Sequence, residues 1–444
     1  MRIIDARRED PFDALKSRTP TCDEAVGRAV EEIIEDVRKR GDQALLDNAR
    51  KFDAPGIESI QVTADEIDSA SVPPEQARAI EVAAERVLDF HTRQYEALVS
   101  GEQPTESGAG RAREWYAGGR FAGRVGRRYV PIDTVGVYAP RGTAGYPSSI
   151  IMNVLPAKAA HVRDTVVTTP AGPDGKLSPA VLVALRTVRY SEGFRAFKVG
   201  GAAAIAALAL GTESVPRVDK VVGPGNKFVN EAKRQFWGTV GLDGYAGPSE
   251  VCVLADATAN AKFAAADILT QIEHASDNCA YLVCDDEPKL REILSEIDAQ
   301  ATGAPREKVL REALAGEGMA FLAASKSQAL DIVNAVAVEH LTIMTADPEK
   351  DMLKIQNAGC IFLGDWSAEA AGDFCVGPSH TLPTAGAARF DSPVNVLTFL
   401  KVQSVVRLTR EQMADLAPVV ETFGAMEGFP AHARGAACRF EEEL

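Results

Sequence analysis

The sequence predicts an α/β fold of two tandem, Rossmann-like, doubly wound units, with a helical segment before them and a small segment after them. From Tyr129 onward, short β-branched runs alternate with alanine-rich helical stretches, a pattern typical of parallel sheets with crossover helices. The chain has 444 residues, and single cores usually stop growing at ~250 to 300 residues. More than one domain is therefore expected.

The first hundred residues are predicted to be helical. Val26, Val30 and Val37 recur at helical spacing, and Gly41 ends this stretch. A second helix is expected after Pro74, and the polar residues 100–110 are expected to form a loop. We expect these helices to act as scaffold.

The first α/β unit is predicted to contain four strands, each followed by a helix. The predicted strands are Thr134–Tyr138, Thr165–Thr169, Phe197–Gly200 and Lys220–Val222. The predicted helices are Ser148–Ala160, Ser178–Val188, Ala202–Leu210 and Lys227–Trp237. Such alternation predicts one doubly wound sheet.

The second unit repeats this alternation. Its predicted strands are Val251–Leu254, Ala280–Cys284, Leu341–Met344 and Cys360–Leu363, and its predicted helices are Lys262–Glu273, Glu287–Ala301 and Lys326–Ala337. A strand at Ser404–Leu408 and a helix at Thr409–Gly428 follow. This last segment is too small to fold alone, so we expect it to dock on a neighbour.

Charge and hydropathy exclude two classes of partner. A net charge of −15 opposes binding to nucleic acid phosphates. No run approaches the ~20 apolar residues that span a bilayer, and the charged start lacks the apolar core of a secretory signal. We expect a cytoplasmic protein without nucleic acid or membrane partners.

A metal site is predicted in the second half, where several of the 6 histidines lie near amides or carboxylates. Gln271 and His274 are three positions apart on a predicted helix, so they share a face and suit one cation such as Zn²⁺, Mn²⁺ or Co²⁺. Asp373, in a glycine-punctuated stretch, and His432 are further candidates. Helix capping by Asp373, or core packing of any one histidine, is the alternative.

Glu339 and His340 form a candidate acid/base pair. They are adjacent, just ahead of the predicted strand Leu341–Met344. Both side chains titrate within reach of neutral pH once perturbed, which suits proton abstraction from an alcohol and then from water. The alternative is a buried structural pair at a strand edge.

A glycine-rich turn, Gly223-Pro224-Gly225-Asn226, leaves a strand and opens a helix. Its backbone N–H groups are candidates for binding a pyrophosphate. Phe228 replaces the third glycine of the usual dinucleotide fingerprint, and no clear acidic ribose ligand follows ~20 residues later. An ordinary Rossmann coenzyme site is not supported by this turn alone.

The ordered motifs of the chain resemble those of the histidinol dehydrogenase family from about Thr21 to Arg439. They are Val135-Gly136-Val137-Tyr138, Tyr146-Pro147-Ser148-Ser149, Gly223-Pro224-Gly225-Asn226, Ala246-Gly247-Pro248-Ser249-Glu250, Gln271-Ile272-Glu273-His274, Glu339-His340-Leu341, Ser379-His380-Thr381-Leu382-Pro383-Thr384 and Glu427-Gly428-Phe429-Pro430-Ala431-His432. This resemblance implies a homodimer with shared active sites and one Zn²⁺ per subunit. Such an enzyme oxidises L-histidinol through the aldehyde to L-histidine and consumes two NAD.

The resemblance also implies a role for individual residues. Gln271, His274, Asp373 and His432 would bind zinc, with His432 reaching the partner subunit's site. His340 would accept the alcohol proton, and Glu339 would activate water. The implied substrate contacts are Ser249, Gln271, His274, His340, Asp373, His380, Glu427 and His432, and the implied coenzyme contacts are Tyr138 and Asn226.

The implied domain organisation has four parts. Residues 1–30 would form an N-terminal helical arm, and residues 31–137 with 249–393 a larger Rossmann-like domain carrying the metal and acid/base residues. Residues 138–248 would form a second Rossmann-like domain facing the coenzyme. Residues 394–444 would form a C-terminal dimerisation segment that reaches the partner subunit.

Four positions depart from the usual pattern of the family. Ala203 stands where glutamine is common, Arg141 where glycine is common, Val338 where proline is common and Thr342 where glutamate is common. Two alternatives therefore stay open. One is a related zinc- and NAD-dependent dehydrogenase of another small alcohol, such as a sulfonated diol, and the other is a non-catalytic metal-binding dimer.

Overall fold

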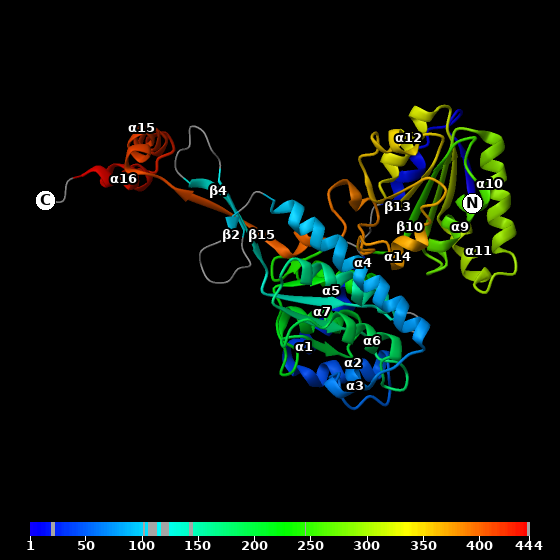
Figure 1. The fold of residues 1–444 in the computed structure, drawn as a ribbon, viewed down its shortest axis with the longest axis horizontal. Coiled ribbons are helices and arrows are strands. Elements are labelled where there is room, and N and C mark those ends of the chain that lie inside the picture. The colour runs from blue at the N-terminus through cyan, green and yellow to red at the C-terminus, as the bar shows by residue number, and fades with distance from the viewer. Residues whose placement is uncertain are drawn as a thin grey trace. The chain divides into compact units, whose positions relative to one another are not determined.

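The computed structural model describes residues 1–18, 23–100, 103–104, 113–116, 124–141, 145–244 and 246–441 (Figure 1). The chain forms two compact units. The first comprises Met1–Tyr95 and Ile132–Phe399, and the second comprises Glu96–Pro131 and Leu400–Leu444. Within the described ranges, no helix is long and apolar enough to cross a membrane.

The first unit contains a parallel five-stranded sheet with the order β7-β6-β5-β8-β9. Its strands are β5 (Thr134–Tyr138), β6 (Asp164–Thr168), β7 (Arg195–Phe197), β8 (Lys220–Val222) and β9 (Gly241–Leu242), and its helices are α5 (Pro147–Ala159), α6 (Pro179–Val188), α7 (Gly201–Leu210) and α8 (Lys227–Gln235). The chain winds outward from β5 to β7 and returns to the other side of β5 with β8. This reversal places a topological switch point between β5 and β8.

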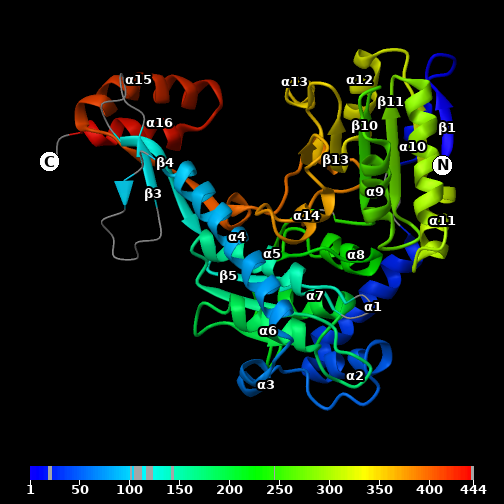
Figure 2. The same ribbon diagram turned by 45° about the vertical axis from the view of Figure 1, so that its right-hand side comes forward.

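A parallel six-stranded sheet in the same unit has the order β1-β12-β11-β10-β13-β14 (Figure 2). Its strands are β1 (Arg2–Asp5), β10 (Glu250–Ala255), β11 (Cys279–Cys284), β12 (Gly318–Leu322), β13 (Val338–Met344) and β14 (Ala358–Leu363), and its helices are α9 (Ala261–Ile272), α10 (Glu287–Ala301), α11 (Glu307–Gly316), α12 (Lys326–Val336), α13 (Pro348–Met352) and α14 (Glu369–Phe374). From β10 onward the winding is the same as in the five-stranded sheet.

Both faces of the six-stranded sheet are covered, because successive side chains of a strand point to opposite faces. Val251 and Val253 pack in one buried cluster with residues of α9, α10 and α11. Cys252 and Leu254 pack in another with residues of α12. Burial on both faces explains why the strands are continuous apolar runs.

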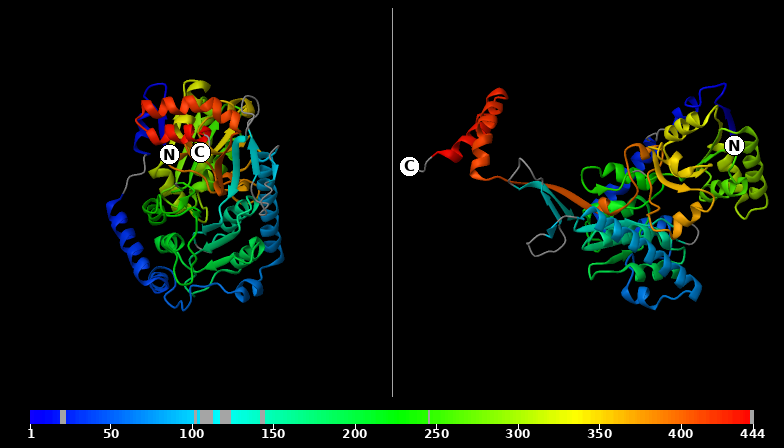
Figure 3. Two further views of the ribbon diagram at one scale, coloured as in Figure 1. Left: turned by 90° about the vertical axis from the view of Figure 1, so that its left-hand side faces the viewer. Right: turned by 45° about the horizontal axis from the view of Figure 1, so that its top comes forward.

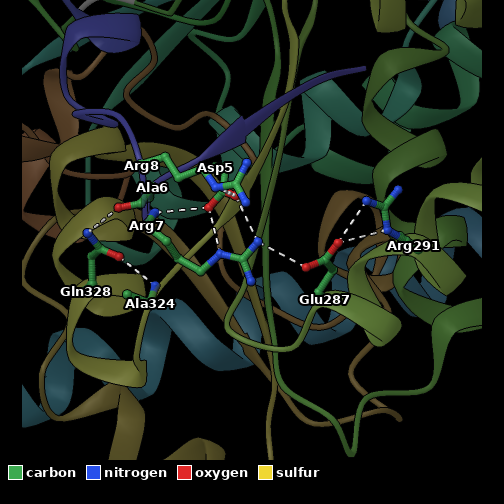
Figure 4. A network of polar contacts seen from close by, with 8 residues as sticks. All are labelled: Asp5, Ala6, Arg7, Arg8, Glu287, Arg291, Ala324 and Gln328. Carbon is green, nitrogen blue, oxygen red and sulfur yellow. Dashed lines mark hydrogen bonds and ion pairs between the residues drawn. The ribbon is translucent and has the colours of Figure 1, made fainter.

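The chain begins with a strand, which corrects the prediction that residues 1–30 form a helical arm. β1 pairs in parallel with β12, and Ile4 is buried in the core. The segment after β1 is fixed by Arg7, whose guanidinium donates to Asp5 Oδ1 (2.7 Å) and to Glu287 Oε2 (3.0 Å) (Figure 4). Strand pairing and this network hold the segment on the six-stranded sheet.

The two predicted N-terminal helices are confirmed as α1 (Glu24–Arg40) and α4 (Pro74–Leu98), and two further helices, α2 (Asp42–Phe52) and α3 (Ala64–Ser69), lie between them. Val26, Val30 and Val37 are buried in one cluster with residues of α7 and α8. α1 and α2 therefore pack on the five-stranded sheet, whereas the predicted domain boundaries assigned residues 31–137 to the other sheet. The apolar face of α1 packs against the alanine-rich helix α7, and the sequence does not indicate that these two distant segments contact each other.

The second unit contains an antiparallel sheet with the order β15-β4-β3-β2 (Figure 3). Its elements are β2 (Gln103–Pro104), β3 (Arg113–Tyr116), β4 (Arg124–Pro131), β15 (Leu400–Arg407), α15 (Arg410–Met426) and α16 (Pro430–Ala437). Short 3-10 helices complete the described chain at Asp13–Arg18, Ala387–Arg389, Val396–Phe399 and Cys438–Phe440. The strand and the helix predicted for this segment are present as β15 and α15. Thr409 caps α15 through a reciprocal capping box with Gln412.

Candidate active site

Glu339 and His340 lie inside β13, whereas the sequence predicted them just ahead of that strand. β13 begins at Val338 and pairs with β10 and β14 on its two sides. Both side chains are buried. They stand at the amino end of the strand, although doubly wound sheets usually bind ligands at the carboxyl ends.

The His340 imidazole is surrounded by oxygen atoms. Its Nδ1 lies 3.3 Å from the carbonyl oxygen of Glu250 and 3.5 Å from Glu339 Oε2, and its Nε2 lies 3.6 Å from Asp373 Oδ1. Burial lowers the pKa of His340, but the carboxylates of Glu339 and Asp373 outweigh it and raise that pKa well above its ordinary value. A histidine in such surroundings is a strong proton acceptor.

Glu369 is a site residue that the sequence did not predict. It opens α14, is fully buried, and its Oε1 lies 3.6 Å from His340 Nδ1. Neither carboxyl oxygen has a hydrogen-bond partner among the described residues, and burial raises its pKa well above the ordinary range. The spacing Glu369-x-x-x-Asp373 on one helical face is the signal that would have identified it.

Gln271 and Asp373, two of the predicted metal ligands, contact each other directly. Gln271 Nε2 donates to Asp373 Oδ2 at 2.8 Å, and both residues are buried. Asp373 lies in the last turn of α14 and not in a loop. Burial raises the pKa of Asp373, but His340 outweighs it, so that pKa lies below its ordinary value. Asp373 is therefore held as an anion.

His274 lies beyond the helix on which it was predicted. α9 ends at Ile272, and the backbone N–H of His274 donates to the Gln271 carbonyl oxygen (3.4 Å) in a tightened final turn. Residues three apart lie on one side of such a 3-10-type turn, and the His274 side chain is exposed. Its charge still acts on Asp373, which places it in the same neighbourhood.

Glu427 and His432 belong to the second unit. Glu427 is the C-cap of α15, and His432 lies in α16 with its ring 5.2 Å from that of Phe429. Both are exposed. Over the described ranges, no group of three or more His, Cys, Asp or Glu side chains is arranged to hold a metal ion. The fourfold metal site therefore stays a prediction.

Ser249 and His380 lie around the Gln271–Asp373 pair. The backbone N–H of Ser249 donates to Asn278 Oδ1 (3.1 Å), and Asn278 Nδ2 donates to the Gln271 carbonyl oxygen (2.7 Å). His380 Nδ1 lies 2.8 Å from the carbonyl oxygen of Asp373. Burial lowers the pKa of His380, so its ring is held neutral beside the site.

The predicted coenzyme residues line a second feature, a cavity of about 1190 Å³ at the carboxyl ends of β5 and β8. Tyr138, Asn226, Ala203 and Arg141 all line it. Asn226 Oδ1 accepts hydrogen bonds from the backbone N–H groups of Phe228 and Val229. The side chain thus caps α8, and these two N–H groups are not free for a pyrophosphate.

A buried ion pair stabilises the Gly223 turn beside this cavity. Lys233 Nζ lies 2.7 Å from Asp243 Oδ1, and both side chains are almost fully buried. Asp243 Oδ2 also accepts a hydrogen bond from the Gly223 backbone N–H (2.6 Å). The pair fixes the backbone of the turn that leads to Asn226.

Comparison with known proteins identifies the family of the chain. The histidinol dehydrogenase family profile matches residues 16–440. A histidinol dehydrogenase of Listeria monocytogenes is 40% identical over 447 residues, covering 100% of both chains, and one of Bacillus licheniformis is 38% identical over 432 residues, covering 97% of each. The crystal structure of histidinol dehydrogenase from Elizabethkingia anophelis superposes with a TM-score of 0.88 at 32% identity, covering 99% of this chain and 98% of that one. The chain therefore belongs to the histidinol dehydrogenase family.

Proposed function

We propose that this protein is an NAD-dependent dehydrogenase that oxidises L-histidinol by way of histidinal to L-histidine, the last step of histidine biosynthesis. Family membership over nearly the whole chain supports this function. The single observation that carries it is the buried Glu339–His340 pair placed next to Gln271 and Asp373. We propose the cytoplasm as the setting of this biosynthetic reaction.

In the first oxidation, His340 is the proton acceptor. Its Nδ1 faces the carbonyl oxygen of Glu250, an arrangement that holds a proton on Nδ1 and makes Nε2, which faces Asp373, the proton acceptor when the ring is neutral. Nε2 takes the hydroxyl proton of the alcohol while the hydride of the same carbon passes to the nicotinamide ring. Glu369 faces the same Nδ1 and helps to orient the ring.

In the second oxidation, Glu339 activates a water molecule. Its Oε2 accepts a hydrogen bond from the backbone N–H of Glu250 (2.9 Å), which leaves Oε1 for water. Glu339 takes one proton as the water oxygen bonds to the aldehyde carbon, and a second hydride then leaves the hydrate to a second NAD. Hydride loss leaves the carboxylic acid, which releases its proton to solvent and becomes the carboxylate of histidine.

We propose zinc as the bound cation, held by Gln271, His274 and Asp373 of one subunit and by His432 of the partner subunit. The neutral imidazoles, amide oxygen and carboxylate suit zinc, and the buried contact between Gln271 and Asp373 supports this assignment. When bound, the ion would anchor the substrate's imidazole and amine and keep the reacting carbon in place. Ser249, His380 and Glu427 are proposed as further substrate contacts.

We propose a homodimer, because the second unit exposes large apolar side chains. Val419, Phe423 and Met426 on α15 and the neighbouring Phe429 are all at least half exposed, and such groups of apolar side chains mark protein interfaces.

Arg141 was the reason to consider an anionic substrate, but it lines the predicted coenzyme cavity beside Tyr138. Its position removes the reason to prefer a sulfonated diol.

The direct test is turnover of histidinol by purified, zinc-loaded protein with NADH followed by absorbance. We expect two NADH for each histidinol consumed, with histidine as product. Turnover of other small alcohols without turnover of histidinol would favour the related dehydrogenase. Absence of turnover with any alcohol, together with intact zinc binding, would favour the non-catalytic dimer.

A further inference from the structure

The coenzyme cavity lacks a hydrogen-bonding side chain where doubly wound folds usually place one. In those folds, an acidic residue near the end of the second strand binds the ribose hydroxyls of NAD. The second strand of this sheet is β6, and the chain continues from it to Pro170, which lines the cavity. A proline side chain neither donates nor accepts a hydrogen bond, so this strand end supplies no ribose ligand.

Asp53 lies next to this position, although it comes from α2, far away in the sequence. A Cβ atom built on Gly200 would lie 2.6 Å from Pro170 Cγ and 3.0 Å from Asp53 Oδ2, so both side chains border the same glycine. Asp53 is the C-cap of α2 and lines the cavity. The fold therefore places a carboxylate from the end of α2 beside the strand end that carries no acidic residue.

The backbone around Asp53 is fixed by packing. Ala54, the next residue, and Ile57 are buried in one cluster with Ala171, the neighbour of Pro170. The Ile57 carbonyl oxygen also accepts a hydrogen bond from Arg50 Nε (3.1 Å). The carboxylate is thus held beside the end of β6.

The surroundings of Asp53 suit a neutral hydroxyl donor. Burial raises the pKa of Asp53 to about 6, and the charge of Arg141 opposes that rise, so the group is anionic at neutral pH and partly stripped of water. Hydrogen bonds from ribose hydroxyls would restore its lost solvation. A 2′-phosphate would instead place like charges together, which is costly at low dielectric.

We propose that Asp53 selects NAD over NADP by accepting hydrogen bonds from the adenosine ribose and repelling a 2′-phosphate. This inference rests on the NAD-dependent activity proposed above and names the residue that decides which coenzyme the cavity takes. Arg141, beside Asp53, is the cation that a 2′-phosphate would meet once the carboxylate is removed.

The test is calorimetric titration of NAD and NADP into the full-length protein and its Asp53→Asn variant, without alcohol substrate. We expect the native protein to bind NAD at least roughly tenfold more tightly than NADP, and the variant to reduce that ratio by roughly tenfold. Asp47→Asn is the matched control, since Asp47 lines the same cavity but pairs with Arg40 at 2.7 Å. We expect this control to keep the native ratio.

Three outcomes would overturn the inference: equal binding of the two coenzymes by the native protein, an unchanged ratio in Asp53→Asn, or an equal change in Asp47→Asn. Thermal unfolding identifies a variant that fails to fold, in which case Asp53→Ser replaces Asp53→Asn with the same expectation. Histidinol turnover separates this inference from the proposed function. Coenzyme selection by Asp53 without histidinol oxidation would contradict only the function, whereas oxidation with an unchanged ratio would contradict only the role of Asp53.

Discussion

Two neighbouring side chains, His340 and Glu339, are proposed to serve the two oxidations in turn. We expect His340→Asn to slow oxidation of histidinol by roughly 10²- to 10⁴-fold, the range typical of a lost general base. Glu339→Gln should slow oxidation of histidinal more than that of histidinol. The two steps are measured separately by supplying each substrate in turn, and small, equal losses in both variants would contradict these roles.

The pH dependence of activity follows from the same histidine. His340 accepts a proton only in its neutral form, and the surrounding carboxylates raise its pKa well above the ordinary value of 6.5. Activity should therefore rise with pH and be lost as the pH falls through this raised pKa. A profile of kcat/KM for histidinol against pH tests this, and an acid limb below pH 6.5 would contradict it.

Glu369 is predicted to reduce stability for the benefit of activity. Its fully buried carboxyl group has no hydrogen-bond partner among the described residues, and such a group costs about 1 to 3 kcal/mol. Glu369→Met, similar in size and apolar, should raise the free energy of unfolding by about that amount and lower kcat. Denaturant unfolding and turnover measure both effects, and a destabilised variant would show that Glu369 is structural.

At the scale of elements, the turn before α8 depends on the buried Lys233–Asp243 pair. Lys233→Met leaves a buried, unpaired carboxylate, which typically costs about 3 to 5 kcal/mol. Arg291→Met is the control, because its pair with Glu287 is exposed and exposed pairs contribute little to stability. Denaturant unfolding compares the two variants, and similar losses would contradict the importance of the buried pair.

Most elements were predictable from periodicity, and the exceptions have physical causes. The predicted bounds of β5 and β8 agree with the structure, because β-branched residues dominate both strands. β12 was missed because Gly318–Leu322 contains no β-branched residue, and only its pairing with β1 and β11 makes it a strand. The strand propensity of a segment does not indicate whether it pairs with strands that are distant in the sequence.

The site was predictable in part. Glu339, His340, Gln271 and Asp373 were recognised from their types and motifs, and the structure brings them together. The sequence did not identify Glu369 and Asp53, because an acidic residue in a helical stretch is usually a solvated surface residue. Their roles depend on burial against distant segments, which spacing along the chain does not report.

At the scale of the whole molecule, His432 is proposed to serve the partner subunit's site. His340→Asn and His432→Asn should each be inactive alone, but a mixed dimer has one site with neither change. If subunits exchange at random, half of the dimers are mixed, so roughly a quarter of native activity should return. Activity after mixing and refolding the two variants measures this, and no recovery would contradict shared sites.

One site is proposed to perform both oxidations in sequence, with His340 serving the alcohol and Glu339 serving the aldehyde. The most direct measurement is the number of NADH formed per histidinol in a single turnover, for the native protein and for Glu339→Gln. We expect two NADH for the native protein, and for the variant a stall near one NADH while histidinal accumulates. A single NADH from the native protein, or two from the variant at the native rate, would contradict it.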